Sequence, residues 1–314
     1  MSYAIGIDVG GTFTDAVVAA PDGAVTLAKA ATTPDDQSAG VLAAIARAAE
    51  ALGMTPAALL GATDRIVHGT TAATNALLQG KGARVAMLTT EGHRDIVEMR
   101  EGLKPERYNL RLAPPPPPVP RALRFGVRER LRADGSVAIP LDPASLDAAL
   151  AVLARERIEA VAVCFLHSWA DPAHERQAAD AVRARLPGAY VCNSADVLGR
   201  IKEFERFSTA IANAAVGPVI GAYLGRLEAR LAEAGFAGAL FVILSHGGLA
   251  SVAEATRLAA GTALSGPAGG VAAAAALAAS GPARDLIALD MGGTSTDIAL
   301  LRDGAPGLAE GREV

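Results

Sequence analysis

Two short stretches near opposite ends of the chain share a pattern of residues that could bind a phosphate group. They read "DVGGTFTD", from Asp8 to Asp15, and "DMGGTSTD", from Asp290 to Asp297. Glycine has no Cβ, so the backbone of such a turn can approach an anion closely, and its N–H groups and threonine hydroxyls can donate to phosphate oxygens. A hairpin needs glycine for its geometry alone, but two copies of the whole pattern favour a nucleotide polyphosphate held from both sides.

The residue types assign a role to each position of the two turns. An aspartate at the end of a strand supplies a hard oxygen ligand for Mg²⁺, directly or through water, so Asp8 and Asp290 are the candidate metal ligands. Asp15 and Asp297 lie in the second strand of each unit, where a structural role and a functional role are equally open. The candidate phosphate ligands are the glycines and threonines of the turns: Gly10, Gly11, Thr12, Thr14, Gly292, Gly293, Thr294 and Thr296.

The segment "VHGTTAATN" predicts a second place where an anion could bind. A strand that ends at His68 is followed by a helix that begins near Thr70, and helix N-termini attract anions. His68, Thr70, Thr71 and Asn75 are therefore candidate substrate or phosphate ligands. The alternative is that Thr70 or Thr71 only caps the helix.

Two further segments contain candidate residues. In "LSGPAGG", Ser265 can cap a helix whose first position is Pro267, so Ser265 and Gly266 join the candidate ligands, with a packing role as an equal alternative. In "SHGG", His246 follows a strand and is a candidate general base. A lone histidine in such a place is more often structural, so the general base stays unassigned.

Composition limits the class of protein. The 314 residues are 51% hydrophobic but only 4% aromatic, which predicts one large or two ordinary domains with an aliphatic core. A net charge of −4 gives no reason to expect nucleic acid or an anionic membrane as a partner. No stretch approaches the roughly 18–20 apolar residues of a membrane span, and the N-terminus lacks a signal-peptide pattern. Cys164 and Cys192 match no metal pattern and are predicted to be buried thiols. We expect a cytoplasmic protein.

The order of predicted elements indicates an α/β fold. An apolar helix is predicted near Asp36–Leu52, after three short strands separated by glycine-containing turns. "RLAPPPPPVP", residues 111–120, predicts a stiff polyproline spacer, and a long helical region is expected over Lys202–Ala234. Strands that alternate with helices favour a sheet covered by helices. The three strands expected at the start are Tyr3–Val9, Phe13–Ala20 and Ala24–Lys29.

Several motifs of the sequence resemble those of a known family. "IGIDVGGTFTDAVV" and "LDMGGTSTDIALL" resemble the two phosphate motifs of the actin, Hsp70 and sugar-kinase superfamily. "HGTTAATNALLQGKGARVAMLTTEGHRDIVEMR" narrows the resemblance to the hydantoinase A/5-oxoprolinase family. "FLHSWADPAHE", "EFERFSTAIANAAVGPVIGAYL" and "SGPAGGVAAAAALA" add to it, so the resemblance covers essentially the whole chain.

The resemblance implies an actin-like, ribonuclease H-like α/β fold in which two lobes close on ATP and Mg²⁺. It assigns residues 1–200 to the family's N-terminal region and 201–314 to the start of its hydantoinase A domain. Family members are roughly twice as long, so we expect the first lobe and only the beginning of the second. The Gly11 and Gly293 turns are expected to face each other. The hairpin of the second motif should dock on the first lobe, pair with another chain or be poorly ordered.

The resemblance also implies an activity, which is ATP-dependent cleavage of a cyclic amide such as a hydantoin or 5-oxoproline. ATP-dependent carboxylation of a ketone such as acetone is the first alternative, and a regulatory ATPase or an inactive truncated scaffold is the second. Expected partners are a hydantoinase B-type subunit or the missing C-terminal half, with a homo-oligomer also possible. "SHGG" and Leu198-Gly199-Arg200 depart from the family's usual residues, so the resemblance assigns no substrate residues.

Overall fold

The computed structural model describes residues 2–33, 36–102, 106, 108–113, 115–291 and 296–307. The chain forms two compact units. The outer unit joins Met1–Lys81 to Val219–Val314, and the inserted unit, Gly82–Pro218, interrupts it. The division near residue 200 concerns family segments rather than compact units, and it stays a prediction.

A six-stranded mixed sheet forms the core of the outer unit, in the order β12-β11-β4-β1-β2-β3. Strand β1 pairs antiparallel with β2, and β2 with β3, whereas β4 runs parallel to β1 and β11 parallel to β4. The prediction that the first three strands are antiparallel neighbours in a mixed sheet is therefore confirmed. The bounds are β1 Tyr3–Val9, β2 Phe13–Ala19, β3 Val25–Ala31, β4 Thr63–Thr70, β11 Ala239–Ile243 and β12 Leu249–Ser251.

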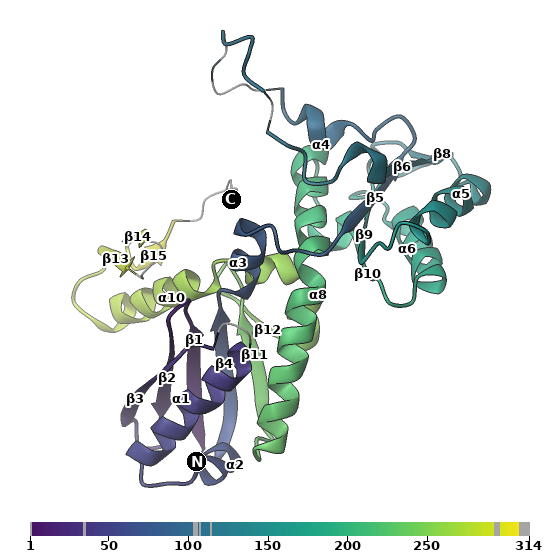
Figure 1. Cartoon of the computed structure of the whole chain (residues 1–314). Helices are drawn as coiled ribbons and strands as arrows, with labels where there is room; N and C mark the ends of the chain where they lie inside the picture. The colour runs from purple at the N-terminus through teal and green to yellow at the C-terminus, as the bar shows by residue number, and fades with distance from the viewer. Residues whose placement is uncertain are drawn as a thin grey trace. The chain divides into compact units, whose positions relative to one another are not determined.

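One face of this sheet is apolar and is covered by a helix. Side chains alternate along a strand, so Ile5, Ile7 and Val9 of β1 point to the same face, and all three are buried. Helix α1 (Gln37–Ala51) packs on this side of β1, β2 and β3 and buries alanines and branched residues such as Ile45 (Figure 1). The other helices are α2 Pro56–Gly61, α3 Ala72–Leu78, α9 Val252–Arg257, α10 Ser265–Ser280 and the 3₁₀ helix η2 Ala259–Thr262.

Helix α8 (Glu203–Glu233) is the longest element and continues through Pro218, where the two units divide. An 18-residue window of α8 reaches a mean hydropathy of 1.4, which is long and apolar enough to cross a membrane. The expectation that no stretch has this character was wrong. Buried core helices pass the same test, and 56% of the window is buried inside the protein, so packing accounts for its apolar residues.

The inserted unit contains a four-stranded parallel sheet in the order β10-β9-β5-β6. Strands β5 and β9 are buried along their whole length. Parallel strands covered on both faces have continuous apolar sequences, as "AVAVC" does and as "VAML" does at the start of β5, before Thr89 and Thr90. The bounds are β5 Val85–Thr90, β6 Arg124–Val127, β9 Ala160–Cys164, β10 Tyr190–Asn193, the hairpin β7 Arg130–Leu131 and β8 Val137–Ile139, and helices α4 Ile96–Met99, η1 Arg121–Leu123, α5 Pro143–Leu153, α6 Ala173–Arg185 and α7 Ser194–Val197.

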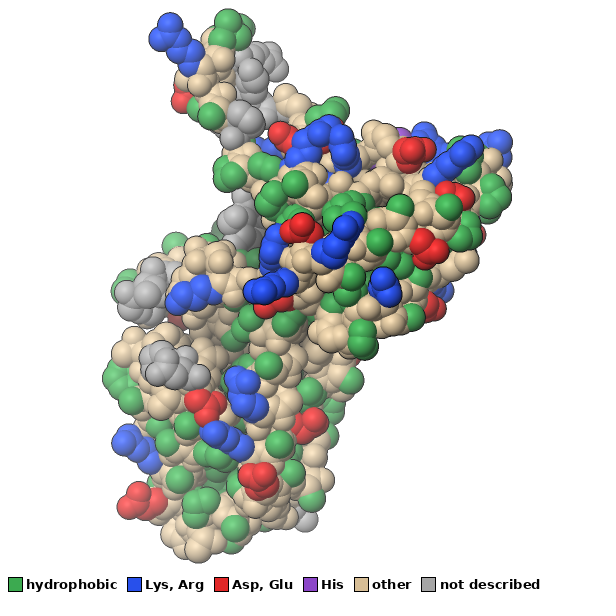
Figure 2. Space-filling view, turned by 45° about the vertical axis from the view of Figure 1, so that its right-hand side comes forward, with side chains coloured by type: hydrophobic (Ala, Val, Ile, Leu, Met, Phe, Trp, Pro, Cys, Tyr) green, Lys and Arg blue, Asp and Glu red, His purple; other side chains and the backbone are tan. Residues whose placement is uncertain are grey.

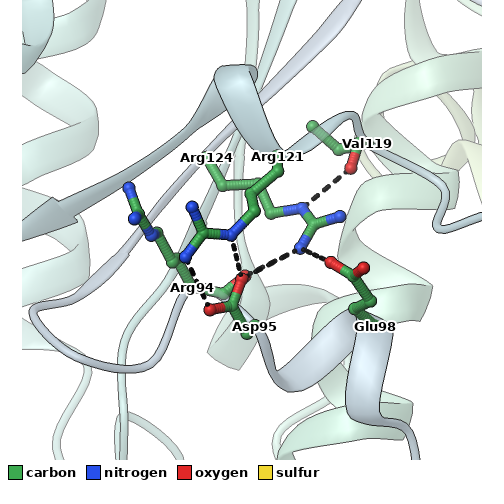
Figure 3. A network of polar contacts seen from close by, with 6 residues as sticks. All are labelled: Arg94, Asp95, Glu98, Val119, Arg121 and Arg124. Carbon is green, nitrogen blue, oxygen red and sulfur yellow. Dashed lines mark hydrogen bonds and ion pairs between the residues drawn. The ribbon is translucent and has the colours of Figure 1, made fainter.

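A buried arginine forms a hydrogen bond that holds the end of the proline-rich stretch in place (Figure 3). The described part of residues 111–120 forms neither helix nor strand, in line with its composition. Arg124 is fully buried, and its Nη1 donates to Glu98 Oε2 at 2.9 Å while its Nε donates to Val119 O at 2.8 Å. Arg121 binds Asp95 with two hydrogen bonds of 2.9 and 3.1 Å. The network ties Val119, next to the prolines, to helix α4 and to the start of β6.

Two of the family motifs meet in a second buried network of the inserted unit. Glu175 and Arg206 are fully buried and are joined through Ser194, which donates to Glu175 Oε1 at 2.6 Å and accepts from Arg206 Nε at 3.0 Å. Glu175 also accepts from Phe165 N at 2.7 Å, and Arg206 Nη2 donates to Phe165 O at 2.7 Å. Burial raises the pKa of Glu175. These residues of "FLHSWADPAHE" and "EFERFST" therefore hold the unit together.

Both cysteines behave as structural thiols. Cys164 and Cys192 are free and buried, which confirms the prediction that they are buried thiols. Burial raises the pKa of Cys192 to about 12 and that of Cys164 well above its usual range. Neither thiol is therefore ionised at neutral pH.

The surface mixes charges of both signs. On the face shown in Figure 2, acidic and basic side chains are scattered among apolar ones. Exposed pairs such as Lys29 with Asp15, at 3.0 Å, bring opposite charges together. This is the pattern expected when basic and acidic residues nearly balance.

The second strand–turn–strand segment forms a small separate sheet in the outer unit. Strands β13 (Leu286–Met291), β14 (Thr296–Arg302) and β15 (Ala305–Pro306) pair antiparallel in this order. This sheet contacts α10 (Figure 1). Leu301 of β14 is buried. One expected outcome was docking on the first lobe, whereas the main contacts of this sheet are with α10, which lies within residues 201–314.

Candidate functional site

The first Gly-Gly-Thr turn lies where β1 ends and joins it to β2. Gly10 N donates to Phe13 O at 2.9 Å, and a Cβ at Gly10 would lie 3.1 Å from that same oxygen. The turn itself therefore requires this glycine. A Cβ at Gly11 would meet nothing within 4 Å, and Gly11 and Thr12 are exposed. This half of the turn is the part that a ligand can reach.

Thr14, also a candidate phosphate ligand, lies inside the protein. It is fully buried, and its hydroxyl lies 3.1 Å from the hydroxyl of Thr32. Thr32 Oγ1 in turn donates to Gly10 O at 2.9 Å. The contacts of Thr14 and Thr32 thus hold the turn in place from its buried side.

Asp8 lies beside the turn, between the backbones of two glycines. In the β1–β4 register it is opposite Gly69, and in the β1–β2 register it is opposite Asp15. A Cβ at Gly69, or one at Gly266 of α10, would lie 3.1 Å from Asp8 Oδ1. We call the space between Gly69 and Gly266 the glycine slot. Any larger residue at either position would press against the carboxylate.

The structure brings Asp8 and Asp290 within electrostatic reach of each other, although they are far apart in sequence. Asp8 is exposed as a residue, but the surrounding protein removes solvent from its carboxylate. This loss of solvent raises the pKa of Asp8, and the negative charges of Asp290 and Asp15 raise it further. Neighbouring carboxylates repel each other unless a cation or a proton joins them.

These two carboxylates fit a magnesium ion held together with a nucleotide. No group of three or more His, Cys, Asp or Glu side chains among the described residues is placed to hold a metal. Mg²⁺ in nucleotide sites does not need such a cage, because one or two carboxylates share it with phosphates and water. Asp8, beside the exposed turn, and Asp290, within electrostatic reach of Asp8, supply that number of ligands.

His68 and Thr70 lie behind the slot, on the opposite face of β4 from Gly69. His68 is fully buried, and its Nε2 lies 2.8 Å from the hydroxyl of Tyr223 on α8. Burial lowers the pKa of His68 to about 4, so the ring is neutral at pH 7. Its Nδ1 is buried without a hydrogen-bond partner among the described residues. In this structure His68 supports β4 and does not line the slot.

Ser265 joins the end of β4 to the start of α10. Its hydroxyl accepts from Thr70 N at 3.0 Å and donates to Thr70 O at 2.9 Å. Nearby, Thr71 Oγ1 donates to Val9 O at 3.2 Å, and Asn75 Nδ2 donates to Thr71 Oγ1 at 3.2 Å. Ser265 and Thr70 are buried, whereas Thr71, Asn75 and Gly266 are partly exposed. The structure thus gathers both candidate segments around Asp8.

Several predicted site residues fall outside this description. Gly292, Gly293 and Thr294 lie outside the described residues, and so does the expectation that Gly11 and Gly293 face each other. Thr296 is exposed at the start of β14, opposite Met291. His246 is exposed, and its Nδ1 accepts from Gly248 N at 3.2 Å within the turn after β11. This contact agrees with the structural alternative for that histidine.

Sequence reasoning missed three residues of the site. Gly69 is part of "HGTT", and its position directly opposite Asp8 was open to prediction once β1 and β4 were paired. Thr32 follows β3 and carries no motif. Tyr223 lies in an apolar stretch of α8, where one more aromatic residue gives no signal of a contact with His68.

The fold belongs to a known class, the actin-like ATPase-type folds. Two solved structures establish the fold. Nucleotide-free acetone carboxylase matches with a TM-score of 0.88 and 30% identity over 97% of this chain and 44% of that chain. The ATP-dependent caprolactamase of Pseudomonas jessenii matches with a TM-score of 0.82 and 38% identity over 95% and 43%.

The chain belongs to the hydantoinase/oxoprolinase family. The family model of the hydantoinase/oxoprolinase N-terminal region matches residues 4–186, and the hydantoinase/oxoprolinase model matches residues 206–314. Caprolactamase subunit alpha of Pseudomonas jessenii is 39% identical over 96% of this chain and 44% of the relative. The acetophenone carboxylase gamma subunit of Aromatoleum aromaticum is 35% identical over 95% and 42%. The chain therefore spans less than half the length of these relatives.

Proposed function

We propose that this chain forms the nucleotide-binding part of an ATP-dependent enzyme that opens a cyclic amide by phosphorylating its oxygen. The family to which the chain belongs supports use of ATP. The similarity to a caprolactamase subunit supports a cyclic amide as the substrate class.

The observation that carries this proposal is the position of Asp8. Its carboxylate lies in the glycine slot, beside the exposed Gly11–Thr12 half of the turn and within reach of the charge of Asp290. In the proposed complex the turn binds phosphate oxygens through backbone N–H groups. Asp8 and Asp290 would hold Mg²⁺, which would neutralise charge on the transferred phosphoryl group. The chain's own share is thus positioning and electrostatic stabilisation.

The proposed reaction begins with attack of the amide oxygen on the γ-phosphorus of ATP. The bond from phosphorus to the ADP oxygen breaks, and the amide becomes an O-phosphorylated imidate. One water adds to the carbon as the ring C–N bond breaks, which leaves the phosphoryl group on a carboxyl oxygen. A second water then releases phosphate and the ring-opened amino acid. The general base for these waters is not assigned to any residue of this chain.

A second candidate function is ATP-dependent carboxylation of a ketone. The TM-score of 0.88 to acetone carboxylase and the 35% identity to an acetophenone carboxylase subunit support it. The same phosphoryl transfer would then activate an enolate or bicarbonate. A phosphate turn and a metal-binding carboxylate serve either reaction, so the described site does not separate the two.

The relatives whose names identify subunits support a partner for this chain. We propose that a hydantoinase B-type subunit or a segment equivalent to the rest of the relatives' length completes the enzyme. A cytoplasmic location and a homo-oligomeric form are also proposals.

Calorimetry and phosphate release test the function. ATP with Mg²⁺ is titrated into the chain alone, and into the chain mixed with the part of the Pseudomonas jessenii caprolactamase alpha subunit that lies beyond the matched region. Phosphate release is then measured with caprolactam, 5-oxoproline, hydantoin, or acetone plus bicarbonate.

We expect weak binding and no substrate-stimulated turnover by the chain alone, and stimulation by a cyclic amide, with ring-opened product, in the mixture. Stimulation only by acetone plus bicarbonate would favour the carboxylase. Turnover that depends on a protein partner but on no small substrate would favour a regulatory ATPase. Absence of nucleotide binding in both settings would contradict the proposal and favour an inactive scaffold.

A further inference from the structure

The hydroxyl of Tyr223 lies at the centre of the contacts behind the glycine slot. Tyr223 is almost fully buried on α8. Its hydroxyl is 2.8 Å from His68 Nε2, and it also shares a hydrogen bond with the side chain of Thr70. A single polar group from a helix therefore contacts both residues that flank Gly69.

This contact matters because the side chains of β4 alternate between the two faces of the sheet. His68 and Thr70 lie on the face of β4 toward α8, and Gly69 between them faces Asp8. A shift of β4 away from α8 would break both hydrogen bonds of Tyr223. It would also move the Gly69 backbone, which lies opposite Asp8 in the β1–β4 register, relative to the Asp8 carboxylate.

Through Thr70, Tyr223 is also linked to the start of α10, which forms the other wall of the glycine slot. The two hydrogen bonds between Thr70 and Ser265 fix the end of β4 to the start of α10, and Gly266 follows Ser265 directly. A Cβ at Gly69 would lie 3.8 Å from the Cα of Gly266, so the two walls are close to contact. The position of Thr70 thus sets the width of the slot.

We infer that Tyr223 is a positioning residue for Asp8: through His68 and Thr70 it fixes the glycine slot in which Asp8 binds the metal of a metal–nucleotide complex. The inference rests on the proposed nucleotide site. The hydroxyl of Tyr223 contacts His68 and Thr70, which lie on the opposite face of β4 from Asp8. Its effect on binding is therefore confined to the interaction that depends on Asp8, which is the one with the metal.

The test compares ATP binding by wild type and Tyr223→Phe, with Mg²⁺ and with EDTA in its place. Tyr223→Phe removes the hydroxyl and keeps the ring. We expect the Kd for ATP with Mg²⁺ to rise about tenfold, because the walls of the glycine slot lose the hydrogen bonds that fix them. The Kd for ATP in EDTA is expected to stay within about twofold of wild type, because the Gly11–Thr12 backbone is not involved.

Tyr190→Phe is the matched control. Tyr190 is a tyrosine of the inserted unit whose hydroxyl accepts from Asn213 Nδ2 at 3.0 Å. Its loss should lower the melting temperature and leave both Kd values unchanged. His68→Gln is the second variant, because a glutamine amide can still bond the Tyr223 hydroxyl. It should keep most of the Mg²⁺-dependent affinity that Tyr223→Phe loses.

The outcomes separate this inference from the proposed function. If wild type binds no ATP in any setting, the proposed function fails and the inference fails with it. If wild type binds ATP with Mg²⁺ and Tyr223→Phe binds it equally well, only the inference is overturned. It is also overturned if Tyr223→Phe loses affinity equally with and without Mg²⁺, since that is the result of a general loss of stability.

Discussion

The hairpins of the two candidate phosphate motifs have the same strand register and opposite surroundings. Asp8 pairs with Asp15 across β1 and β2, and Asp290 pairs with Asp297 across β13 and β14. Yet Ile5 of β1 is 1% exposed, whereas Ile287, the equivalent residue of β13, is 73% exposed. The motif therefore determines the hairpin, and elements elsewhere in the chain determine whether it becomes part of a core.

The first hairpin is embedded because other strands and helices contact it. Strand β4 pairs with β1, β3 pairs with β2, and α1 covers their apolar face. Within the residues that the structure describes, the second hairpin pairs only with the two-residue strand β15 and contacts α10. The same pattern of apolar residues is thus a core in one place and a surface in the other.

Replacing the two equivalent isoleucines by alanine tests this difference most directly. Ile5→Ala removes a buried side chain and leaves a cavity, so it should lower the free energy of unfolding by about 2 to 5 kcal/mol. Ile287→Ala should change it by no more than about 0.5 kcal/mol. Urea unfolding of both variants measures these values. Equal losses would mean that the second hairpin is covered in solution.

Lowering the pH should reduce the free energy of unfolding through His68, which lies next to the first hairpin. His68 has a pKa of about 4 in the folded protein and 6.5 in the unfolded chain. The unfolded chain therefore binds more protons between these values, and stability falls as the pH falls from about 6.5 to 4. The expected loss is about 3 kcal/mol. Urea unfolding of wild type and His68→Gln at pH 7 and pH 4.5 measures it, and an equal loss in both proteins would contradict a buried neutral histidine.

The two aspartates should differ in what their replacement does to stability. Because the folded-state pKa of Asp8 is raised, its ionised form opposes folding above its unfolded pKa of 3.8, so Asp8→Asn should raise the melting temperature at pH 7 without Mg²⁺. Asp290 is exposed, and Asp290→Asn should leave the melting temperature nearly unchanged. Both should weaken ATP binding in Mg²⁺ about tenfold, the order expected for one charged contact.

Calorimetry and thermal unfolding on the same samples check both halves of this prediction. If Asp8→Asn bound ATP with Mg²⁺ normally but melted much earlier than wild type, Asp8 would be a structural residue.

The smallest expected effects distinguish the two glycines of the first turn. Gly11→Ala adds a methyl group where nothing lies within 4 Å, whereas the methyl of Gly10→Ala would meet Phe13 O at 3.1 Å. We expect Gly11→Ala to change the free energy of unfolding by less than about 0.5 kcal/mol and to weaken ATP binding, and Gly10→Ala to lower stability. The opposite order of melting temperatures would contradict the geometry of the turn.

The sequence predicts the local structure of this site better than its environment. Strands β1 to β3 agree with the prediction to within two residues at each end, because alternating apolar residues and glycine turns specify them locally. The approach of Asp8 to Asp290 agrees with the repeated motif. The burial of Thr14, His68 and Ser265 was not predictable, because a hydroxyl or an imidazole beside a turn fits a ligand and a buried partner equally well.

The features that the sequence does not predict depend on tertiary contacts. Tyr223 meets His68 only because α8 packs behind β4, and no spacing along the chain indicates that contact. The apolar character of α8 can be read from the sequence, but its burial depends on elements that are distant in sequence. What the motifs do predict is which backbone comes close to Asp8.

The interleaving of the two units has a consequence for how the chain folds during synthesis. The inserted unit is continuous, so all of its contacts are available once Pro218 has left the ribosome. The outer unit is not, because Val67 of β4 pairs with Phe241 of β11. Such distant pairings slow folding, and until Phe241 emerges β4 presents an unpaired edge to the solvent. The candidate site on β1 and β4 is thus completed only after the inserted unit has been made, and β4 is most exposed to misassociation during that interval.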